Sequence, residues 1–225
     1  MKDIFLVDLD ETLLDFRRGE REQLARALKN AGMAAGEREL SRFHEINDGL
    51  WKKLERGELD RKRLTVLRFE MLFAEFSFAG DAEKTAADYF CGMKEAAYLM
   101  SGAKAFLEEL CRRGRIFYVT NGSLAIQRSR LKKSGLDGYA VKAFISEEVG
   151  YDKPSPRFAL AVESGIEGYG RDRAVWLGDS LTSDMACAKS AGIDFILFAP
   201  EGAPQGYGGL CARSYGEALE LVSSL

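Results

Sequence analysis

The segment Ile4–Leu13 reads IFLVDLDETL. Its first four residues are β-branched, aromatic or aliphatic, a run typical of a strand in a parallel sheet covered on both faces. Asp8 and Asp10 follow at the carboxyl end of this strand, the edge where open α/β sheets bind ligands. Two neighbouring carboxylates repel each other unless a cation or a shared proton holds them. A hard cation such as Mg²⁺ would satisfy them, whereas a solvated Asp turn is the alternative that this motif alone leaves open.

The composition indicates a globular chain and argues against several functional classes. With 225 residues and 46% hydrophobic content, the chain can bury one large core or two smaller ones. The net charge of −3 and the lack of a basic block argue against nucleic acid binding, and no membrane span is indicated. The four cysteines form no C-x-x-C pair, so neither a zinc site nor a disulfide framework is predicted. We expect a cytoplasmic protein without an obligate protein partner.

His44 is the only histidine in the sequence. A Ser-His-Asp or Cys-His hydrolase would have to take its base from this residue, and a histidine-rich zinc site is impossible. Acid–base chemistry in this chain is therefore expected to fall to carboxylates.

The hydrophobic pattern divides the chain into two kinds of structure. Residues 16–97 show helical periodicity, with apolar residues three and four apart and glycines at the helix ends. From residue 98 onward strands and helices alternate, which predicts an α/β fold with a Rossmann-like parallel sheet and right-handed crossovers. We expect residues 1–15 and 98–225 to form the catalytic core, with 16–97 inserted as an all-helical lid. Residues 200–213, rich in Gly and Pro, are predicted to be a loop.

Further polar residues follow the later strands of the predicted sheet. Thr120-Asn121-Gly122 follows the second strand, Lys153 the third, and Asp179 the fourth. Asp184 shares a helical face with small apolar residues, so it would be buried and would need a cation. The alternative for Asp184 is a helix N-terminal acid favoured by the helix dipole. Together, these residues predict a charged site at one edge of the sheet.

Four segments, D-L-D-E-T-L, T-N-G, K-P and G-D-S-L-T-S-D, resemble in order and spacing the four motifs of the haloacid dehalogenase (HAD) superfamily. The resemblance covers essentially the whole core, and the helical block resembles the type 1 cap of that superfamily. It implies a Mg²⁺-dependent phosphatase that acts on a small-molecule phosphomonoester through an aspartyl-phosphate intermediate.

The resemblance also implies roles for individual residues. Asp8 would be nucleophile and metal ligand, and Asp10 would protonate the leaving oxygen, activate water and offer its backbone carbonyl to the metal. Thr120 and Lys153 would hold the phosphoryl oxygens, while Asp179 would bind the metal with support from Asp184. Backbone N–H groups of the two turns would complete an anion nest around the phosphate, namely those at Leu9-Asp10 and Asn121-Gly122.

Within the superfamily, the chain is similar to the YjjG-type pyrimidine 5′-nucleotidases. The similarity lies in Ile46–Trp51 (INDGLW) followed by Gly57, in Arg130-Leu131 downstream of T-N-G, and in Ile145–Gly150, and it ends at Tyr151. A phosphatase for phosphoglycolate or a small sugar phosphate is the alternative within the fold. Asp10 argues against a dehalogenase, which needs no proton donor there. The chain has a polar motif residue after each of the four strands, which argues against a non-catalytic phosphate-binding module.

Asn47 is a polar residue on an otherwise apolar helical stripe that also carries Trp51. A buried amide costs free energy unless its donors and acceptor are paired. One explanation is a hydrogen bond to a neighbouring helix. The other is that Asn47 and Trp51 recognise a nucleobase, the amide by hydrogen bonds and the indole by stacking.

Overall fold

The computed structural model describes residues 1–225, which divide into two compact units. The first, Met1–Asp15 with Ala97–Leu225, is called the sheet unit below, and the second, Phe16–Ala96, the helical unit. None of the helices combines the length and apolar character that crossing a membrane requires.

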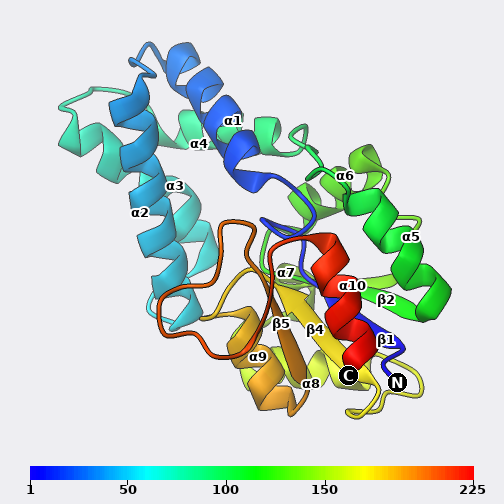
Figure 1. The fold of residues 1–225 in the computed structure, drawn as a ribbon. Coiled ribbons are helices and arrows are strands. Elements are labelled where there is room, and N and C mark those ends of the chain that lie inside the picture. The colour runs from blue at the N-terminus through cyan, green and yellow to red at the C-terminus, as the bar shows by residue number, and fades with distance from the viewer. The chain divides into compact units, whose positions relative to one another are not determined.

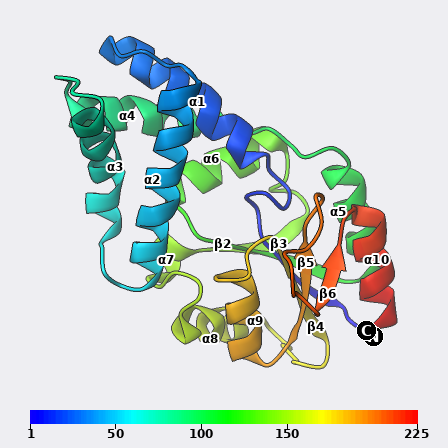
Figure 2. The same cartoon turned by 60° about the vertical axis from the view of Figure 1, so that its left-hand side comes forward.

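The sheet unit contains a six-stranded parallel sheet with strand order β3-β2-β1-β4-β5-β6; Figure 1 labels β1, β2, β4 and β5, and Figure 2 labels β3 and β6 as well. The strands are β1 (Ile4–Val7), β2 (Arg115–Thr120), β3 (Ala140–Ile145), β4 (Ala174–Gly178), β5 (Asp194–Phe198) and β6 (Leu210–Ala212). This order confirms the predicted Rossmann-like α/β fold. From β1 the chain adds β2 and β3 on one side and then β4, β5 and β6 on the other side. The gap between β1 and β4 is therefore the topological switch point, where such sheets open a crevice.

Helices cover both faces of the sheet (Figure 2). Phe5 and Val7 of β1 point to a core shared with α5 (Ala103–Arg113), α6 (Leu124–Ser134) and α10 (Tyr215–Ser224). Ile4 and Leu6 point to the opposite core, which is shared with α8 (Pro156–Ser164) and α9 (Asp184–Ala191). Burial on both faces explains why β1 is apolar throughout instead of alternating.

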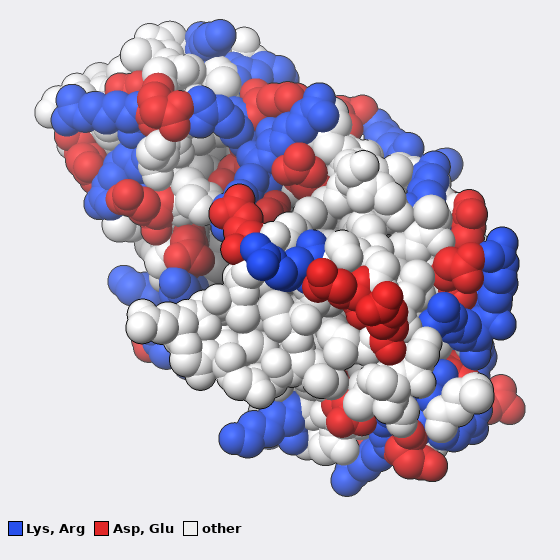
Figure 3. Space-filling model, viewed as in Figure 1, with Lys and Arg blue, Asp and Glu red and all other residues white.

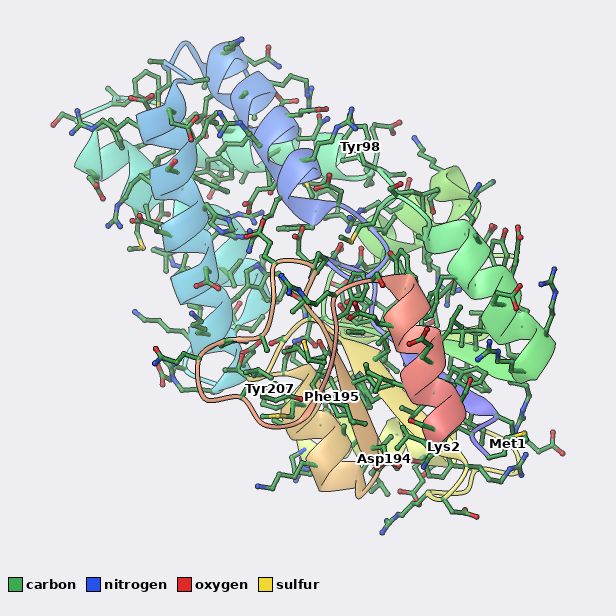
Figure 4. The ribbon with its side chains drawn as sticks, viewed as in Figure 1. Met1, Lys2, Tyr98, Asp194, Phe195 and Tyr207 are labelled. Carbon is green, nitrogen blue, oxygen red and sulfur yellow. The ribbon has the colours of Figure 1, made fainter.

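Tyr215 ties the C-terminal helix to the loop after β1. Its ring stacks on Phe106 and Phe198, with centroids 4.8 and 4.7 Å away, and its hydroxyl donates to the Thr12 carbonyl at 2.7 Å. At the amino end of the strands, the buried Lys2 lies 2.6 Å from the Asp194 carboxylate, linking the start of β1 to β5 (Figure 4). Both contacts fix the chain on either side of the Asp8 turn.

Two short elements were not predicted from the sequence. β6 (Leu210–Ala212) lies within residues 200–213, which we predicted to be entirely loop, so that prediction was wrong. Three residues carry too little periodicity to be recognised as a strand, and this one exists through its parallel pairing with β5. The second is α7 (Ser146–Val149), a single turn after β3 that ends at Gly150 in the left-handed region.

The helical unit consists of α1 (Phe16–Ala31), α2 (Glu37–Glu55), α3 (Arg61–Glu75) and α4 (Ala82–Met93). Side chains of Asp60 and Asp81 cap α3 and α4 by accepting backbone N–H bonds at 2.8 and 2.9 Å. An aromatic cluster of Phe43, Phe69 and Tyr89 joins α2, α3 and α4, with ring centroids 4.9 to 5.6 Å apart. The unit therefore has a hydrophobic core of its own.

Candidate active site

The loop after β1 brings Asp8 to the carboxyl edge of the sheet at the switch point. The Asp8 N–H donates to the Leu177 carbonyl of β4 at 2.9 Å, so strand pairing continues up to the carboxylate. Beyond it the chain turns tightly, with the N–H groups of Leu13 and Leu14 both donating to the Leu9 carbonyl at 2.8 Å. Asp8 is only 4% exposed, so its charge requires partners within the protein.

Lys153 supplies the nearest positive charge. Its buried ammonium donates to Asp8 Oδ1 at 2.6 Å, to Asp184 Oδ1 at 2.6 Å and to the Val119 carbonyl at 3.0 Å. These three bonds use every N–H of the ammonium. Burial alone would lower the pKa of Lys153, but the carboxylates of Asp184 and Asp8 outweigh it and hold that pKa above its ordinary value. Lys153 therefore stays charged.

Asn121 positions Lys153 by clamping its backbone. The Lys153 N–H donates to Asn121 Oδ1 at 2.7 Å, and Asn121 Nδ2 donates to the Lys153 carbonyl at 2.9 Å. Gly122, whose N–H we predicted to face a phosphate, instead donates to the buried Ser146 Oγ at 3.1 Å. The structure thus does not place the Gly122 N–H in an open anion nest, because the start of α7 occupies it.

Asp184, the first residue of α9, is 1% exposed and meets the cation that its predicted burial required. In addition to Lys153, Oδ1 accepts a bond from Trp176 Nε1 at 3.0 Å, and Oδ2 accepts the Ser180 N–H at 3.2 Å. Gly178 makes room for this carboxylate, because a Cβ there would lie 2.4 Å from it. Both oxygens of Asp184 are thus occupied within the protein.

Asp8, Asp179 and Asp184 bring carboxylate oxygens within 4.8 Å of one another. Burial raises the pKa of Asp8 well above its ordinary value despite Lys153, and Asp184 and Asp179 raise it further. Asp179 is open to solvent on one side, yet desolvation by the surrounding protein, with Asp184, raises its pKa to about 7. Three carboxylates face one ammonium, so the fully ionised cluster carries two excess negative charges. Its oxygen donors and its charge suit a hard divalent cation.

Asp10 and Thr120 lie beside this cluster and are joined by the buried Gln127 of α6, while the buried Arg130 of the same helix contacts Asp10. Arg130 NH1 lies 2.6 Å from Asp10 Oδ1, and Gln127 Nε2 donates to both Asp10 Oδ2 and Thr120 Oγ1. The sequence analysis missed Gln127 and noted Arg130 only as part of a resemblance. The sequence did contain one sign of their burial. Gln127 and Arg130 lie at helical spacing with Leu131 and Ser134, which places them on the buried face of α6.

Comparison with known proteins shows to which family the chain belongs. The chain matches the haloacid dehalogenase-like hydrolase family over residues 2–192. The chain belongs to this family.

Among curated relatives of this hydrolase, pyrimidine 5′-nucleotidase PynA of Streptococcus pneumoniae is 36% identical over 196 residues, covering 87% of this chain and 83% of that protein. Pyrimidine 5′-nucleotidase YjjG of Escherichia coli is 28% identical over 192 residues, covering 85% and 83%. Among solved structures, the HAD-hydrolase YfnB of Bacillus subtilis, bound to magnesium, superposes with a TM-score of 0.92 at 26% identity, covering 98% of each chain. The similarity to pyrimidine 5′-nucleotidases that the sequence indicated is therefore confirmed.

In the helical unit of this hydrolase, Asn47 is buried within a polar network. Its Nδ2 donates to Glu20 Oε1 at 2.8 Å, and its Oδ1 accepts from Arg68 NH1 at 3.0 Å. Glu20 Oε2 also contacts His44 Nδ1 at 2.6 Å. Of the two explanations for Asn47, these contacts favour the hydrogen bond to neighbouring helices.

Trp51 is half-buried, and the Arg61 guanidinium lies 5.2 Å from the centroid of its ring. A pocket of about 300 Å³ lies between α1 and α2, lined by residues that include Arg17, Leu24 and His44. Neither Asn47 nor Trp51 is among its lining residues. The structure therefore does not bring the two predicted substrate contacts together at this pocket.

Proposed function

We propose that this hydrolase is a Mg²⁺-dependent phosphatase that cleaves nucleoside 5′-monophosphates, pyrimidine nucleotides foremost, through an aspartyl-phosphate at Asp8. The observation that carries the proposal is the cluster of Asp8, Asp179, Asp184 and Lys153 at the switch point, with its excess of negative charge. The nucleotide substrate is supported by the likeness to PynA and YjjG, which are pyrimidine 5′-nucleotidases.

Asp8 and Asp179 would hold the Mg²⁺, with the Asp10 carbonyl as a further ligand. Asp184 would support them, because its oxygens already accept bonds from Lys153, Trp176 and Ser180. When bound, the ion neutralises phosphoryl oxygens, so that an anionic carboxylate can approach an anionic phosphate. The magnesium-bound structure of YfnB supports this choice of metal.

In the first step, Asp8 attacks phosphorus while the bond from phosphorus to the ester oxygen breaks. Lys153 binds Asp8 Oδ1 at 2.6 Å, whereas Oδ2 accepts only a long bond from the Thr12 hydroxyl at 3.5 Å, so Oδ2 is the oxygen that would attack. The departing alkoxide is a strong base, so Asp10 transfers its proton to that oxygen as the bond breaks. The alcohol leaves, and the phosphoryl group remains on Asp8.

In the second step, water attacks phosphorus and Asp10 accepts its proton. The bond between Asp8 and phosphorus breaks, inorganic phosphate leaves and the Asp8 carboxylate is restored. Thr120 and Lys153 would hold phosphoryl oxygens in both steps, with backbone N–H groups at Leu9-Asp10, and Lys153 would exchange one of its three present bonds for a phosphoryl oxygen. The helical unit would act as a cap that selects the substrate. Recognition of the base by Asn47 and Trp51 stays the alternative that the Asn47→Ala variant tests. We also expect the enzyme to work in the cytoplasm.

A phosphate-release assay over nucleoside monophosphates, phosphoglycolate and sugar phosphates tests the proposal. We expect turnover that requires Mg²⁺, stops with EDTA and favours pyrimidine nucleotides. The variant Asp8→Asn should lose at least about a thousandfold in kcat while keeping its melting temperature, because it removes the nucleophile with little change in shape. Near-normal turnover by Asp8→Asn would refute the aspartyl-phosphate mechanism, and a preference for phosphoglycolate would refute the substrate.

A further inference from the structure

Gln127 links the two side chains that the proposed reaction needs beside the nucleophile. Its Nε2 lies 3.0 Å from Asp10 Oδ2 and 2.8 Å from Thr120 Oγ1, and it donates to both. A primary amide has two N–H donors, so these two bonds use both of them. One side chain on α6 thereby aligns a residue of the β1 loop with a residue at the end of β2.

Arg130 fixes which way the Gln127 amide points. Its NH1 donates to Gln127 Oε1 at 3.0 Å and lies 2.6 Å from Asp10 Oδ1. A guanidinium can only donate, so the amide oxygen must face Arg130 and the amide nitrogen must face Asp10. Gln127 and Arg130 are each only 1% exposed, and such buried polar groups hold their geometry because unpaired alternatives cost free energy.

The same amide sets the role of the Thr120 hydroxyl. That oxygen accepts from Gln127, and its single hydrogen points to the Asn121 carbonyl at 3.3 Å, a long bond. A phosphoryl group offers only acceptor oxygens. With its acceptor side taken by Gln127, the Thr120 hydroxyl is left to donate to such an oxygen.

The chain leaves space for this arrangement at Gly122. A Cβ at that position would lie 3.0 Å from Gln127 Cγ and 3.2 Å from Nε2, tighter than nine in ten real Cβ contacts. The T-N-G segment thus supplies the hydroxyl that Gln127 aligns, the amide that clamps Lys153 and the gap that Gln127 fills.

We propose that Gln127 is a positioning residue, held by Arg130, that aims the Asp10 carboxyl at the leaving oxygen and makes Thr120 a donor to the phosphoryl group. The inference rests on the proposed function, because it gives Asp10 the role of general acid. It implies that Gln127 matters most for substrates whose leaving group is an alkoxide. Such substrates depend on proton transfer far more than those that release a stable phenolate.

The test compares kcat/KM for a pyrimidine nucleoside 5′-monophosphate and for 4-nitrophenyl phosphate, since kcat/KM reports the steps up to departure of the alcohol. For Gln127→Leu we expect a loss of about a hundredfold on the nucleotide and less than about tenfold on the aryl ester. Gln127→Glu keeps the size and the acceptor facing Arg130 but replaces the donor to Asp10. It should show the same selective loss of kcat/KM on the nucleotide. Gln127→Glu therefore tests the inference even if Gln127→Leu does not fold.

Arg128→Ala is the matched control, because Arg128 lies on the same helix and pairs with Glu148 at the surface. It should leave the ratio of the two kcat/KM values unchanged. An equal loss on both substrates by the Gln127 variants, or no loss at all, would overturn the inference. A wild-type enzyme that releases no phosphate in a Mg²⁺-dependent, Asp8-dependent manner would instead refute the proposed function itself.

Discussion

Two buried polar clusters, one in each unit, differ in how their charges are balanced. In the sheet unit, Asp8 and Asp184 share one ammonium and Asp179 adds a third carboxylate. In the helical unit, the buried carboxylate of Glu20 is joined through Asn47 to the buried guanidinium of Arg68. The central side chains of both clusters are buried from solvent. Only the first cluster, however, carries negative charge that no positive side chain within it balances.

This difference distinguishes the site that we propose for chemistry from a cluster that holds the fold of the helical unit. The Arg68 guanidinium lies 4.6 Å from the centroid of the Tyr89 ring and donates to Asn47, so it is surrounded by partners from the unit itself. In the sheet unit, burial above all, together with the neighbouring carboxylates, raises the pKa of Asp8 and brings that of Asp179 to about 7, and perturbed carboxylates of this kind gather at functional sites. Burial of polar groups alone therefore does not identify a functional site. The surface supplies no comparable concentration of charge on the face in Figure 3, where Lys and Arg are interspersed with Asp and Glu.

The largest effect is expected from Lys153→Met. Removing the ammonium leaves the buried carboxylates of Asp8 and Asp184 facing each other, which should cost about 3–5 kcal/mol in the free energy of unfolding. Phosphatase activity should fall at least about a thousandfold, because the phosphoryl oxygens lose their cation. Urea unfolding and phosphate release measure the two effects. The exposed Lys189→Met on α9 should change neither, and a stable, active Lys153→Met would contradict the charge balance described here.

Asp179→Asn should stabilise the metal-free enzyme. Because the folded state raises the pKa of Asp179 to about 7, it holds a proton that the unfolded chain releases near pH 4, so wild-type stability falls as pH rises between these values. At pH 8 in EDTA, we expect the variant to be more stable by about 1 kcal/mol, a small figure because water screens this exposed side chain. Added Mg²⁺ should raise the melting temperature of the wild type and not of the variant.

The exposed Asp172→Asn is the control for that experiment and should leave the pH dependence unaltered. If Asp179→Asn is less stable than the wild type in EDTA at pH 8, the excess of negative charge is not the property that distinguishes this cluster.

Asn47→Ala should act on the fold of the helical unit and not on selectivity. It leaves Glu20 and Arg68 each without one buried partner, at a cost of about 2–3 kcal/mol in the free energy of unfolding. KM for pyrimidine nucleotides and for 4-nitrophenyl phosphate should change by the same factor. Asp48→Ala, at an exposed ion pair on the same helix, is the control. A selective rise in KM for nucleotides with an unchanged melting temperature would instead support base recognition by Asn47.

The smallest effect is expected from His44→Gln. The hydrogen bond with Glu20 raises the pKa of His44, so the pair stabilises the folded state fully below the unfolded pKa of about 6.5. This contribution is lost as pH rises through the raised folded pKa. Because the side chain is half-exposed, we expect a difference of at most about 1 kcal/mol at pH 5.5 that vanishes by pH 9. A difference that grows with pH would show that His44 acts as a neutral partner.

The sequence was sufficient to predict every strand of the sheet except β6, and the polar residues that follow those strands. Asp8, Lys153 and Asp184 follow apolar runs at positions that parallel strands bring to one edge, so local pattern and topology together place them. The burial of Asp184 and its need for a cation were visible from its helical spacing alone.

Side-chain partnerships across long separations were not visible in the same way. Gln127 donates to Asp10 across 117 positions of the chain, and Asn47 donates to Glu20 across 27. No spacing rule connects such pairs, because their contact depends on how helices pack. For that reason, the sequence left both explanations of Asn47 open and missed Gln127.

The most direct test of the central claim is to trap the phosphoryl group on the protein. Enzyme turning over a pyrimidine nucleoside monophosphate with Mg²⁺ is quenched and treated with borohydride, which reduces an acyl phosphate on aspartate to homoserine, and its peptides are sequenced by mass spectrometry. We predict homoserine at position 8 in the wild type and none in Asp8→Asn. Modification at another residue, or none in an enzyme that is releasing phosphate, would contradict the account.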